Sequence, residues 1–291
     1  MVSLIHDRVQ GRNTTTSDPI LHIVASSPVA ASRKDRESWL DLFDEDASIE
    51  DPAGSLPYRS NDPGHGLKDF YDAFIAHSNI AFASEYDYVC DRSVVRDGTI
   101  LLEIGDGQPL HIPVFLRYEV AKSGKISNMQ AYWRLGQSIF RMLGNRSGGF
   151  RYLTGAGKRL FAAAGLRGIG GLAKATVNPA AGARTTVLKL KEYLDTARYS
   201  DAVSLFSYTN SNAIVLYSDN AEAHPAGYLT IGKLKLLSLD KIIESRNRVS
   251  FRCELLISGR KLCGVAFCRL SAAGFRIRTL EFFFSRYPAK D

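Results

Sequence analysis

Long apolar runs are missing from this chain of 291 residues, of which 45% are hydrophobic and 10% aromatic. No stretch of about 18 apolar residues occurs, so the sequence predicts no membrane-spanning helix. The first residues, MVSLIHDRVQGRN, lack the basic region, apolar core and cleavage site of a secretory signal. We therefore expect a globular cytoplasmic protein, long enough for two domains of roughly 100 to 150 residues each.

Cysteine is also scarce, and the four in the chain are Cys90, Cys253, Cys263 and Cys268. They form no CxxC pair and have no histidines at the spacing of a zinc site, so we expect reduced thiols and no metal. Two glycine-rich stretches do not make a nucleotide site. GAGKR at 155–159 lacks the first glycine and the Ser or Thr of a phosphate loop, and GLRGIGG at 165–171 follows no strand. No cofactor is expected.

Acidic residues are absent from Arg141 to Arg184, where eight basic residues occur. Because the whole chain carries a net charge of +7, the remaining residues are together close to neutral. A nucleic-acid-binding domain needs its basic residues on a folded surface with aromatic side chains for stacking, which this distribution does not provide. We expect no nucleic-acid partner.

The same segment, 141–184, is rich in glycine and alanine, which favours a linker or a domain-packing arm. An alternative comes from Leu153, Leu160 and Phe161, which lie among the basic residues. Such a mixture can contact an anionic membrane surface weakly. The segment divides the chain into a first domain at 1–140 and a second at 185–291.

Residues 1–140 predict helices first and strands afterwards. Helical spacing occurs at 17–27, 32–43 and 66–77. Ser32 is the candidate N-cap of the second helix, and its apolar face includes Trp39 and Phe43. Strand patterns separated by the turn signals Asp-Gly, Asp-Gly and Ser-Gly follow at 85–90, 99–104, 109–120 and 125–135. This order predicts an α+β domain in which helices close one side of a curved antiparallel sheet, like a cone.

The second segment repeats this outline, so we predict two tandem cone-shaped domains. An amphipathic helix pattern covers 186–206, and LYSDNAEAHPAG at 216–227 echoes LFDEDASIEDPAG at 42–54. The stretch 232–243 occupies the place of the third helix. Strand patterns then follow at 248–257, 261–270 and 275–284.

The stretch ASIEDPAGS, residues 47–55, places Asp51 after an alternating strand pattern and before Pro52. Pro52 has no backbone N–H that could stabilise a carboxylate. At the mouth of an apolar cone, desolvation would raise the pKa of Asp51 and make it a usable proton acceptor. The alternative is a loop aspartate beside a turn proline.

Three stretches resemble the ketosteroid isomerase-like (SnoaL-like) branch of the nuclear transport factor two-like superfamily, within about Ile20 to Trp133. LFDEDASIEDPAGS at 42–55 resembles the segment with the catalytic base, DFY at 69–71 the third helix, and GKISNMQAYW at 124–133 the last strand. The superfamily contains isomerases, polyketide cyclases, epoxide hydrolases and non-catalytic binders, so the fold transfers better than the activity.

The resemblance assigns the family's functional positions one by one. The general base, which moves a proton between two carbons of a steroid, falls on Asp51, and a supporting tyrosine falls on Tyr71. The aromatic wall of the steroid site falls on Trp133. The two oxyanion donors of the family, a tyrosine and a protonated aspartic acid, fall on Ser27 and Leu116, so this sequence departs from the family at both.

These departures bear on activity, because the family's reaction needs both a base and an oxyanion hole. Loss of one oxyanion donor typically lowers the rate about 10²- to 10³-fold. Leu116 cannot donate a hydrogen bond, and serine reaches less far than tyrosine. Another hydroxyl would have to point inward, and the candidates are Tyr58, Tyr118 and Tyr132.

The second repeat reads HPAG at 224–227 where the first reads DPAG at 51–54. His224 therefore stands at the position equivalent to the base. A neutral histidine can accept a proton near pH 7. The alternative is an ordinary histidine in a loop or at the rim of the cone.

Two hypotheses of different classes follow. The first is an isomerase- or cyclase-type enzyme that acts by proton transfer on a hydrophobic carbonyl compound, steroidal or polyketide-like. The second is a non-catalytic binding or transport protein for an apolar small molecule. In both, the two domains pack as an intrachain pseudo-dimer. The predicted ligand-binding residues are Ser27, Phe43, Leu116, Trp133 and His224.

Overall fold

The computed structural model describes residues 18–104, 109–144, 149–155, 157–158, 182–207, 214–218, 231–257, 259–271 and 275–285. The chain divides into two compact units, and the main division falls between Val177 and Asn178. This division lies inside the segment that the sequence predicts to connect two domains. In the described part of the chain, no helix is long and apolar enough to span a membrane.

The first unit begins with two helices, α2 (Pro19–Arg33) and α3 (Arg36–Asp41). The Asp18 carboxylate caps α2 by accepting a hydrogen bond of 2.9 Å from the backbone N–H of Ile20. The prediction that Ser32 caps the next helix is wrong, because Ser32 lies inside α2. The left-handed backbone of Lys34 ends α2, and Asp35 caps α3 by accepting from the Ser38 N–H at 3.1 Å.

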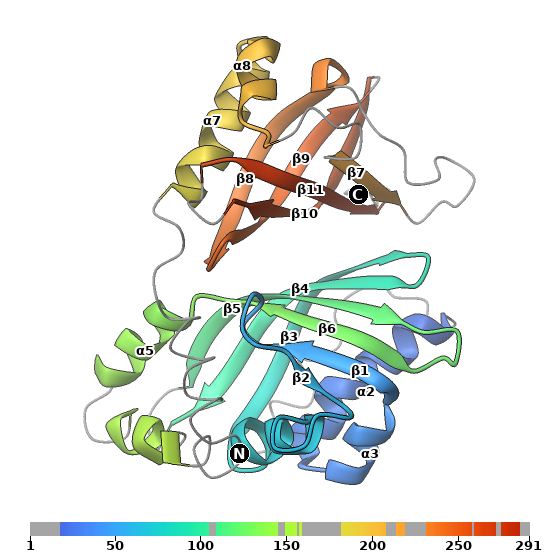
Figure 1. Cartoon of the computed structure of the whole chain (residues 1–291), viewed down its shortest axis with the longest axis vertical. Helices are drawn as coiled ribbons and strands as arrows, with labels where there is room; N and C mark the ends of the chain where they lie inside the picture. Colours follow the sequence, from blue (N-terminus) through green and yellow to red (C-terminus); the bar gives the residue numbers. More distant parts are fainter. Residues whose placement is uncertain are drawn as a thin grey trace. The chain divides into compact units, whose positions relative to one another are not determined.

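The third predicted helix is confirmed, as α4 (Leu67–Phe70) followed by η1 (Tyr71–Ile75), which is a π-helical turn. The Asp69 carboxylate accepts a hydrogen bond from the Gly66 N–H at 2.8 Å and so starts the helix. A fourth helix, α5 (Leu135–Gly144), follows the last strand of the unit. In Figure 1 the helices of this unit lie on one side of its sheet.

The sheet of the first unit has the strand order β2-β1-β6-β5-β4-β3. Strands β1 and β6 pair in parallel, whereas the β4–β5 and β5–β6 pairs are antiparallel. The strand patterns predicted from the sequence are therefore confirmed, with β3 and β4 longer than expected. The strands are β1 (Phe43–Glu50), β2 (Tyr58–Arg59), β3 (Asn79–Cys90), β4 (Ser93–Glu103), β5 (Leu110–Val120) and β6 (Ile126–Tyr132).

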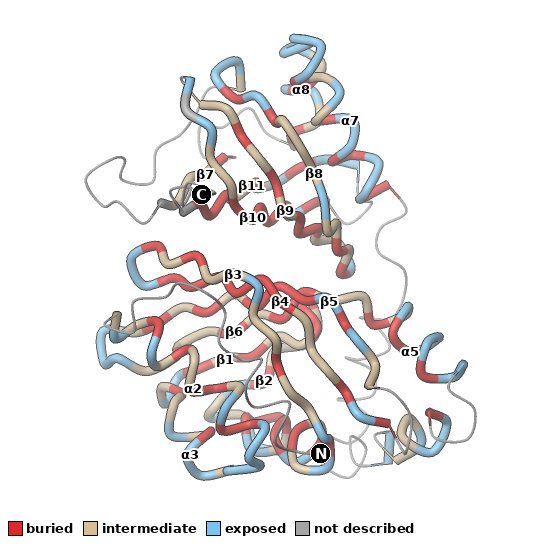
Figure 2. The backbone as a smooth tube through the Cα atoms, turned by 180° about the vertical axis from the view of Figure 1, so that it is seen from behind, coloured by how far each residue is buried: buried red, intermediate tan, exposed pale blue. Residues whose placement is uncertain are grey.

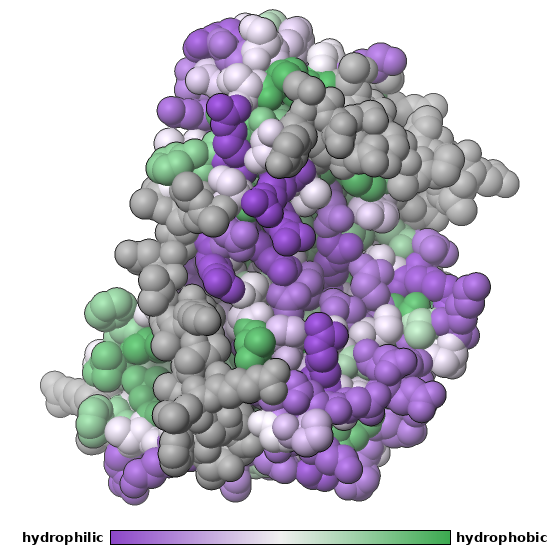
Figure 3. Space-filling view, in the orientation of Figure 1, coloured by the Kyte–Doolittle hydropathy of each residue, from purple (hydrophilic) through white to green (hydrophobic). Residues whose placement is uncertain are grey.

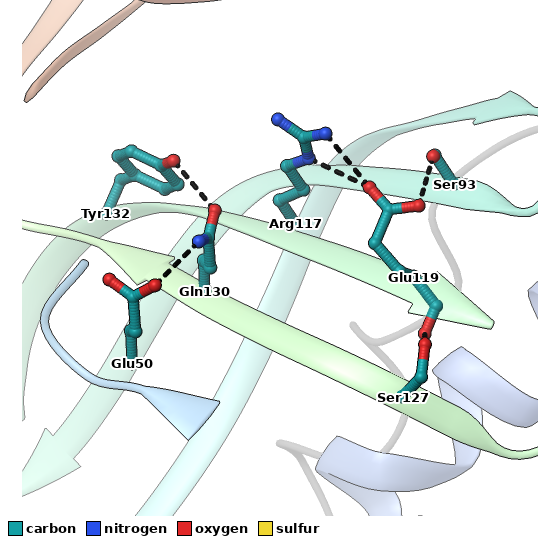
Figure 4. A network of polar contacts seen from close by, with 7 residues as sticks. All are labelled: Glu50, Ser93, Arg117, Glu119, Ser127, Gln130 and Tyr132. Atoms are coloured by element: carbon teal, nitrogen blue, oxygen red, sulfur yellow. Dashed lines mark hydrogen bonds and ion pairs between the residues drawn. The ribbon is translucent and has the colours of Figure 1, made fainter. Parts of the chain in front are cut away.

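The two faces of this sheet differ in chemistry. Buried and less buried residues alternate along the second half of β5 (Figure 2). Leu116 and Tyr118 therefore face the helices, whereas Arg117 and Glu119 face away. Figure 4 shows the polar network on the outer face, in which the Tyr132 hydroxyl donates to Gln130 at 3.0 Å. The other members are Glu50, Ser93, Arg117, Glu119 and Ser127. The polar side chains of β5 and β6 therefore gather outside, and the apolar ones gather on the helix side.

Gly98 lies within β4, so the prediction of a turn at Asp97-Gly98 is wrong. A Cβ atom at this glycine would lie 2.4 Å from the Ala83 carbonyl oxygen and 2.7 Å from Cζ of Phe82. Glycine is therefore needed here because the neighbouring strand approaches closely.

Replacing Gly98 with alanine is expected to lower the free energy of unfolding by about 1 to 3 kcal/mol, because the new methyl group has no room. Urea denaturation measures the change. Gly136→Ala is the matched control, since nothing lies within 4 Å of a Cβ there. Equal stability of Gly98→Ala and wild type would contradict the close approach of β3 to β4.

The second unit repeats the sheet pattern, with the order β7-β11-β10-β9-β8. Its first and last strands pair in parallel, as β1 and β6 do in the first unit. Helices α7 (Ala183–Asp195) and α8 (Tyr199–Ser204) precede this sheet, and α7 packs into its apolar core. The strands are β7 (Ile214–Ser218), β8 (Leu234–Ser245), β9 (Arg248–Ile257), β10 (Arg260–Leu270) and β11 (Ile277–Ser285). Both units are thus helices packed on an antiparallel-rich sheet.

Two predictions for the second unit need correction. The long helix expected at 186–206 is broken between α7 and α8, where Ala197 has a left-handed backbone with φ of 54°. The stretch 232–243, expected in the place of a helix, forms most of β8. Its first residues alternate lysine and leucine, and Leu234 and Leu236 are buried on one face, which is strand periodicity.

Candidate functional site

The first unit encloses a cavity of about 290 Å³. Helix α2 and the α4–η1 helix form one side, and strands β3 to β6 form the other. Nearly all of the lining is apolar, and a volume of this size is close to the lower end for small-molecule sites. Among the described residues that line the cavity, Asp51 is the only acidic one and none is lysine, arginine or histidine.

Asp51 follows the last residue of β1, and its side chain faces the cavity. The indole Nε1–H of Trp133, just after β6, donates a hydrogen bond of 2.5 Å to Oδ1 of Asp51. The pKa of Asp51 is raised from 3.8 to about 6. Burial causes the rise, and the hydrogen bond from Trp133 offsets part of it. The carboxylate is therefore mostly ionised at pH 7 while remaining basic enough to take a proton.

The loop after Asp51 is held in place by short backbone contacts. The N–H of Ala53 donates to the Ala131 carbonyl on β6 at 2.7 Å. The N–H of Gly54 donates to the Glu50 carboxylate, also at 2.7 Å. Because both bonds tie the loop to the sheet, the Asp51 side chain is positioned by the rigid part of the fold.

Tyr118 on β5 lines the cavity two residues after Leu116. Burial raises the pKa of Tyr118 to about 12. The Arg96 charge and a hydrogen bond with Ser27 of α2 lower it, and the Asp51 charge adds to the rise. The hydroxyl therefore stays protonated at neutral pH and can donate a hydrogen bond.

The other two tyrosines named as possible donors do not line the cavity. Tyr132 points to the outer face of the sheet, where its hydroxyl bonds Gln130. Tyr58 stacks on His65 with 3.9 Å between ring centroids. Burial raises the pKa of Tyr58, and the Asp51 charge raises it further. Of the three candidates, Tyr118 alone is a residue of the cavity lining.

The structure brings Ser27, Asp51, Leu116 and Trp133 together around the cavity. It does not place Tyr71 or Phe43 in the lining. Both pack on the buried Trp39, with ring centroids 5.3 Å and 4.5 Å away.

Burial raises the pKa of the Tyr71 hydroxyl, and the next largest influence is Asp35 on the outer side of the helices. Tyr71 is thus a core residue. The charged groups that act on its hydroxyl are Asp35, Arg36 and Asp72, and none of the three lines the cavity. His224 lies outside the described residues.

Sequence reasoning missed one wall of the cavity. Ile139 and Met142 of α5, with Tyr152 and Leu153 of the segment taken for a linker, line it. The Tyr152 hydroxyl lies 2.8 Å from the Ser78 hydroxyl, just after η1. The signal was the spacing of Leu135, Ile139 and Met142 on one helical face, which the surrounding glycines obscured.

The described residues do not meet the requirements of a metal site. Among the described residues, no group of three or more His, Cys, Asp or Glu side chains is placed to hold a metal ion. All four cysteines are free thiols, and three of them are buried.

Solved structures provide the comparisons with known proteins. RV0760c from Mycobacterium tuberculosis, in complex with estradiol-17β-hemisuccinate, is 26% identical, with 41% of this chain and 96% of that chain covered and a TM-score of 0.37. The Δ5-3-ketosteroid isomerase from a Mycobacterium species is 24% identical, covering 40% of this chain and 92% of that one, with a TM-score of 0.34.

The epoxide hydrolase/cyclase-like enzyme SalBIII, which has a role in pyran ring formation in salinomycin, is 17% identical. The match covers 40% of this chain and 91% of that one, with a TM-score of 0.35. No protein-family model matches the chain, and no curated protein matches it. Over about two fifths of its length, the chain is similar to ketosteroid isomerase-like proteins of known structure.

Proposed function

We propose that the first unit binds a hydrophobic carbonyl compound, steroidal or polyketide-like, and isomerises it by proton transfer with Asp51 as the base. The observation that carries this proposal is one carboxylate, with a pKa of about 6, in an otherwise apolar cavity. The apolar lining suits the carbon skeleton of such a ligand. Desolvation by the same lining makes the carboxylate more basic.

The proposed reaction needs no second reactant. The Asp51 carboxylate takes a proton from the carbon between the carbonyl group and a C=C bond of the substrate. The C–H electron pair forms a new C=C bond to the carbonyl carbon, and the π pair of the carbonyl group moves to its oxygen. The protonated Asp51 then returns the proton to a more distant carbon of the same conjugated system. The product is the conjugated isomer, and Asp51 ends as the carboxylate with which it began.

The negative charge on the substrate oxygen needs a hydrogen-bond donor, and we assign this role to Tyr118. Its hydroxyl lies in the lining and stays protonated at neutral pH. Ser27 bonds the same hydroxyl and so orients it. In a cavity that excludes water, one such donor contributes about 10²- to 10³-fold to the rate.

A specific observation favours a second candidate, a non-catalytic binding protein. Leu116 lines the cavity at the position where the resemblance places the family's carboxylic-acid donor. An apolar side chain there improves the fit for a hydrophobic ligand, but it cannot stabilise an oxyanion. The two candidates differ in turnover and share ligand binding.

One experiment tests the proposal. Purified protein is incubated with a β,γ-unsaturated 3-ketosteroid, and the absorbance of the conjugated enone is followed while binding is titrated separately. We expect turnover whose kcat/KM falls about tenfold per pH unit below about pH 6, because protonated Asp51 cannot act as a base. Binding without turnover above the buffer rate would support the binding protein instead.

A further inference from the structure

Helix α5 and residues 149–155 and 157–158 form one wall of the cavity. Leu135, Ile139 and Met142 project from one face of α5 into the lining. Tyr152 and Leu153 continue this wall. The inner side of this wall therefore lines the space in which a ligand would bind.

The outer side of this wall is apolar as well. Phe140 and Leu143 of α5 are 76% and 46% exposed, and Phe150 is 62% exposed. Figure 3 shows hydrophobic residues gathered over α5 at the lower left of the view. Soluble proteins normally keep such clusters small, and a larger one marks a contact surface.

Basic residues accompany these apolar side chains. Arg141, Arg151 and Lys158 are exposed on the same segment, and we call these three with Phe140, Leu143 and Phe150 the outer face. No aspartate or glutamate occurs in the sequence between Glu119 and Glu192. A partner for this face must therefore combine negative charge with an apolar interior.

A bilayer with anionic headgroups has both properties. Interfacial helices of this kind insert apolar side chains below the headgroups while arginine and lysine contact the phosphates. Nucleic acid would satisfy the charge but offers no apolar interior to Leu143 and the two phenylalanines.

We propose that the outer face docks on an anionic membrane surface, so that an apolar ligand passes between the bilayer and the cavity behind α5. Docking stands on the outer face alone, whereas ligand transfer rests on the proposed function. The sequence predicts membrane contact through Leu153, Leu160 and Phe161; Leu153 instead lines the cavity, and Leu160 and Phe161 lie outside the described residues. The proposal places the contact on six other side chains.

Flotation of the full chain with vesicles tests the docking. The protein should float with vesicles of phosphatidylcholine and phosphatidylserine at low salt, and it should stay behind with phosphatidylcholine alone or at high salt. The triple variant Arg141→Gln, Arg151→Gln, Lys158→Gln should bind on the order of a hundredfold more weakly. Phe140→Ser, Leu143→Ser, Phe150→Ser should also lose binding.

Phe275→Ser is the matched control, because Phe275 is also 62% exposed but lies outside the outer face. It should float like wild type. Steroid binding in vesicle-free solution should be equal in all four proteins, which separates failure of docking from failure of the proposed function. Wild type that does not float at low salt would overturn the proposal, as would equal losses in Phe275→Ser. Binding to duplex DNA without flotation, or dimers broken by the serine variant, would assign the face to another partner.

Discussion

Turnover of the Asp51→Asn protein is expected to fall about 10²- to 10⁴-fold, which is the usual contribution of a positioned base. Asparagine has the size of aspartate, and its amide oxygen can still accept the hydrogen bond from Trp133 Nε1. The shape of the cavity and the affinity for ligand should therefore be preserved. Steady-state rates and a ligand titration on both proteins measure the two effects separately.

The same variant should be more stable than wild type at neutral pH. Because the folded pKa of Asp51 is about 6 and its ordinary value is 3.8, the folded protein binds the proton more tightly. Its stability therefore falls as the pH rises between these two values. At pH 7 the raised pKa lowers the free energy of unfolding of the wild type by about 3 kcal/mol, and this loss disappears below about pH 4. Thermal melts of both proteins at pH 4 and pH 7 check the sign.

Asp46→Asn is the matched control for both measurements. It removes a carboxylate from the strand that leads to Asp51, but Asp46 is exposed on β1 and does not line the cavity. Its turnover and its pH-dependent stability should resemble those of wild type. Full turnover by Asp51→Asn would show that another group takes the proton, and a loss of ligand binding would show that Asp51 shapes the cavity.

The apolar cavity explains why Asp51 is both more basic than an ordinary aspartate and destabilising to the folded protein. Removing water from around a carboxylate makes it a stronger base, and the same removal destabilises the folded protein. The hydrogen bond from Trp133 limits this destabilisation without neutralising the charge. Asparagine or leucine at position 51 would make the folded protein more stable than aspartate does. If Asp51→Asn proves stabilising, aspartate is retained at a cost in stability, which indicates selection for function.

Most of the fold could be predicted from periodicity. The helices at 17–27 and 66–77 and the strand patterns after them were recognisable because each buries one face, which leaves a period in the sequence. The prediction failed at Gly98, where an Asp-Gly pair is a turn signal in isolation and only the approach of Ala83 decides otherwise. It failed again at β8, which was assigned by its place in the repeat and against its own alternating pattern.

The candidate site was predictable in part. The motif around Asp51 and the closing strand with Trp133 placed both side chains at the cavity, because strand ends fix their direction. Tyr118 could be named only as one of three tyrosines, since choosing among them requires knowing which way β5 faces. The contribution of α5 was hidden by glycines that resemble a linker, and its role depends on contacts with residues distant in sequence, such as Ser78.

Tyr118→Phe is the second prediction with a large expected effect. The variant removes one hydroxyl from the cavity lining, and we expect kcat to fall about 10²- to 10³-fold. KM should change little, because the hydroxyl stabilises the charged oxygen of the intermediate more than the neutral carbonyl of the substrate. Enone formation over a range of substrate concentrations separates the two constants.

Tyr132→Phe is the matched control for this measurement. It removes the same hydroxyl from the neighbouring strand, where it bonds Gln130 in the polar network on the side of the sheet away from the cavity, so turnover should stay at the wild-type level. Loss of Ser27's partner should lower the stability of Tyr118→Phe by only about 1 kcal/mol, so unfolding cannot account for a hundredfold fall in kcat. If kcat is unchanged while KM rises, Tyr118 contacts the ligand but does not stabilise the oxyanion. In that case the chain would lack an assigned donor, and Leu116 would favour the binding protein over the isomerase.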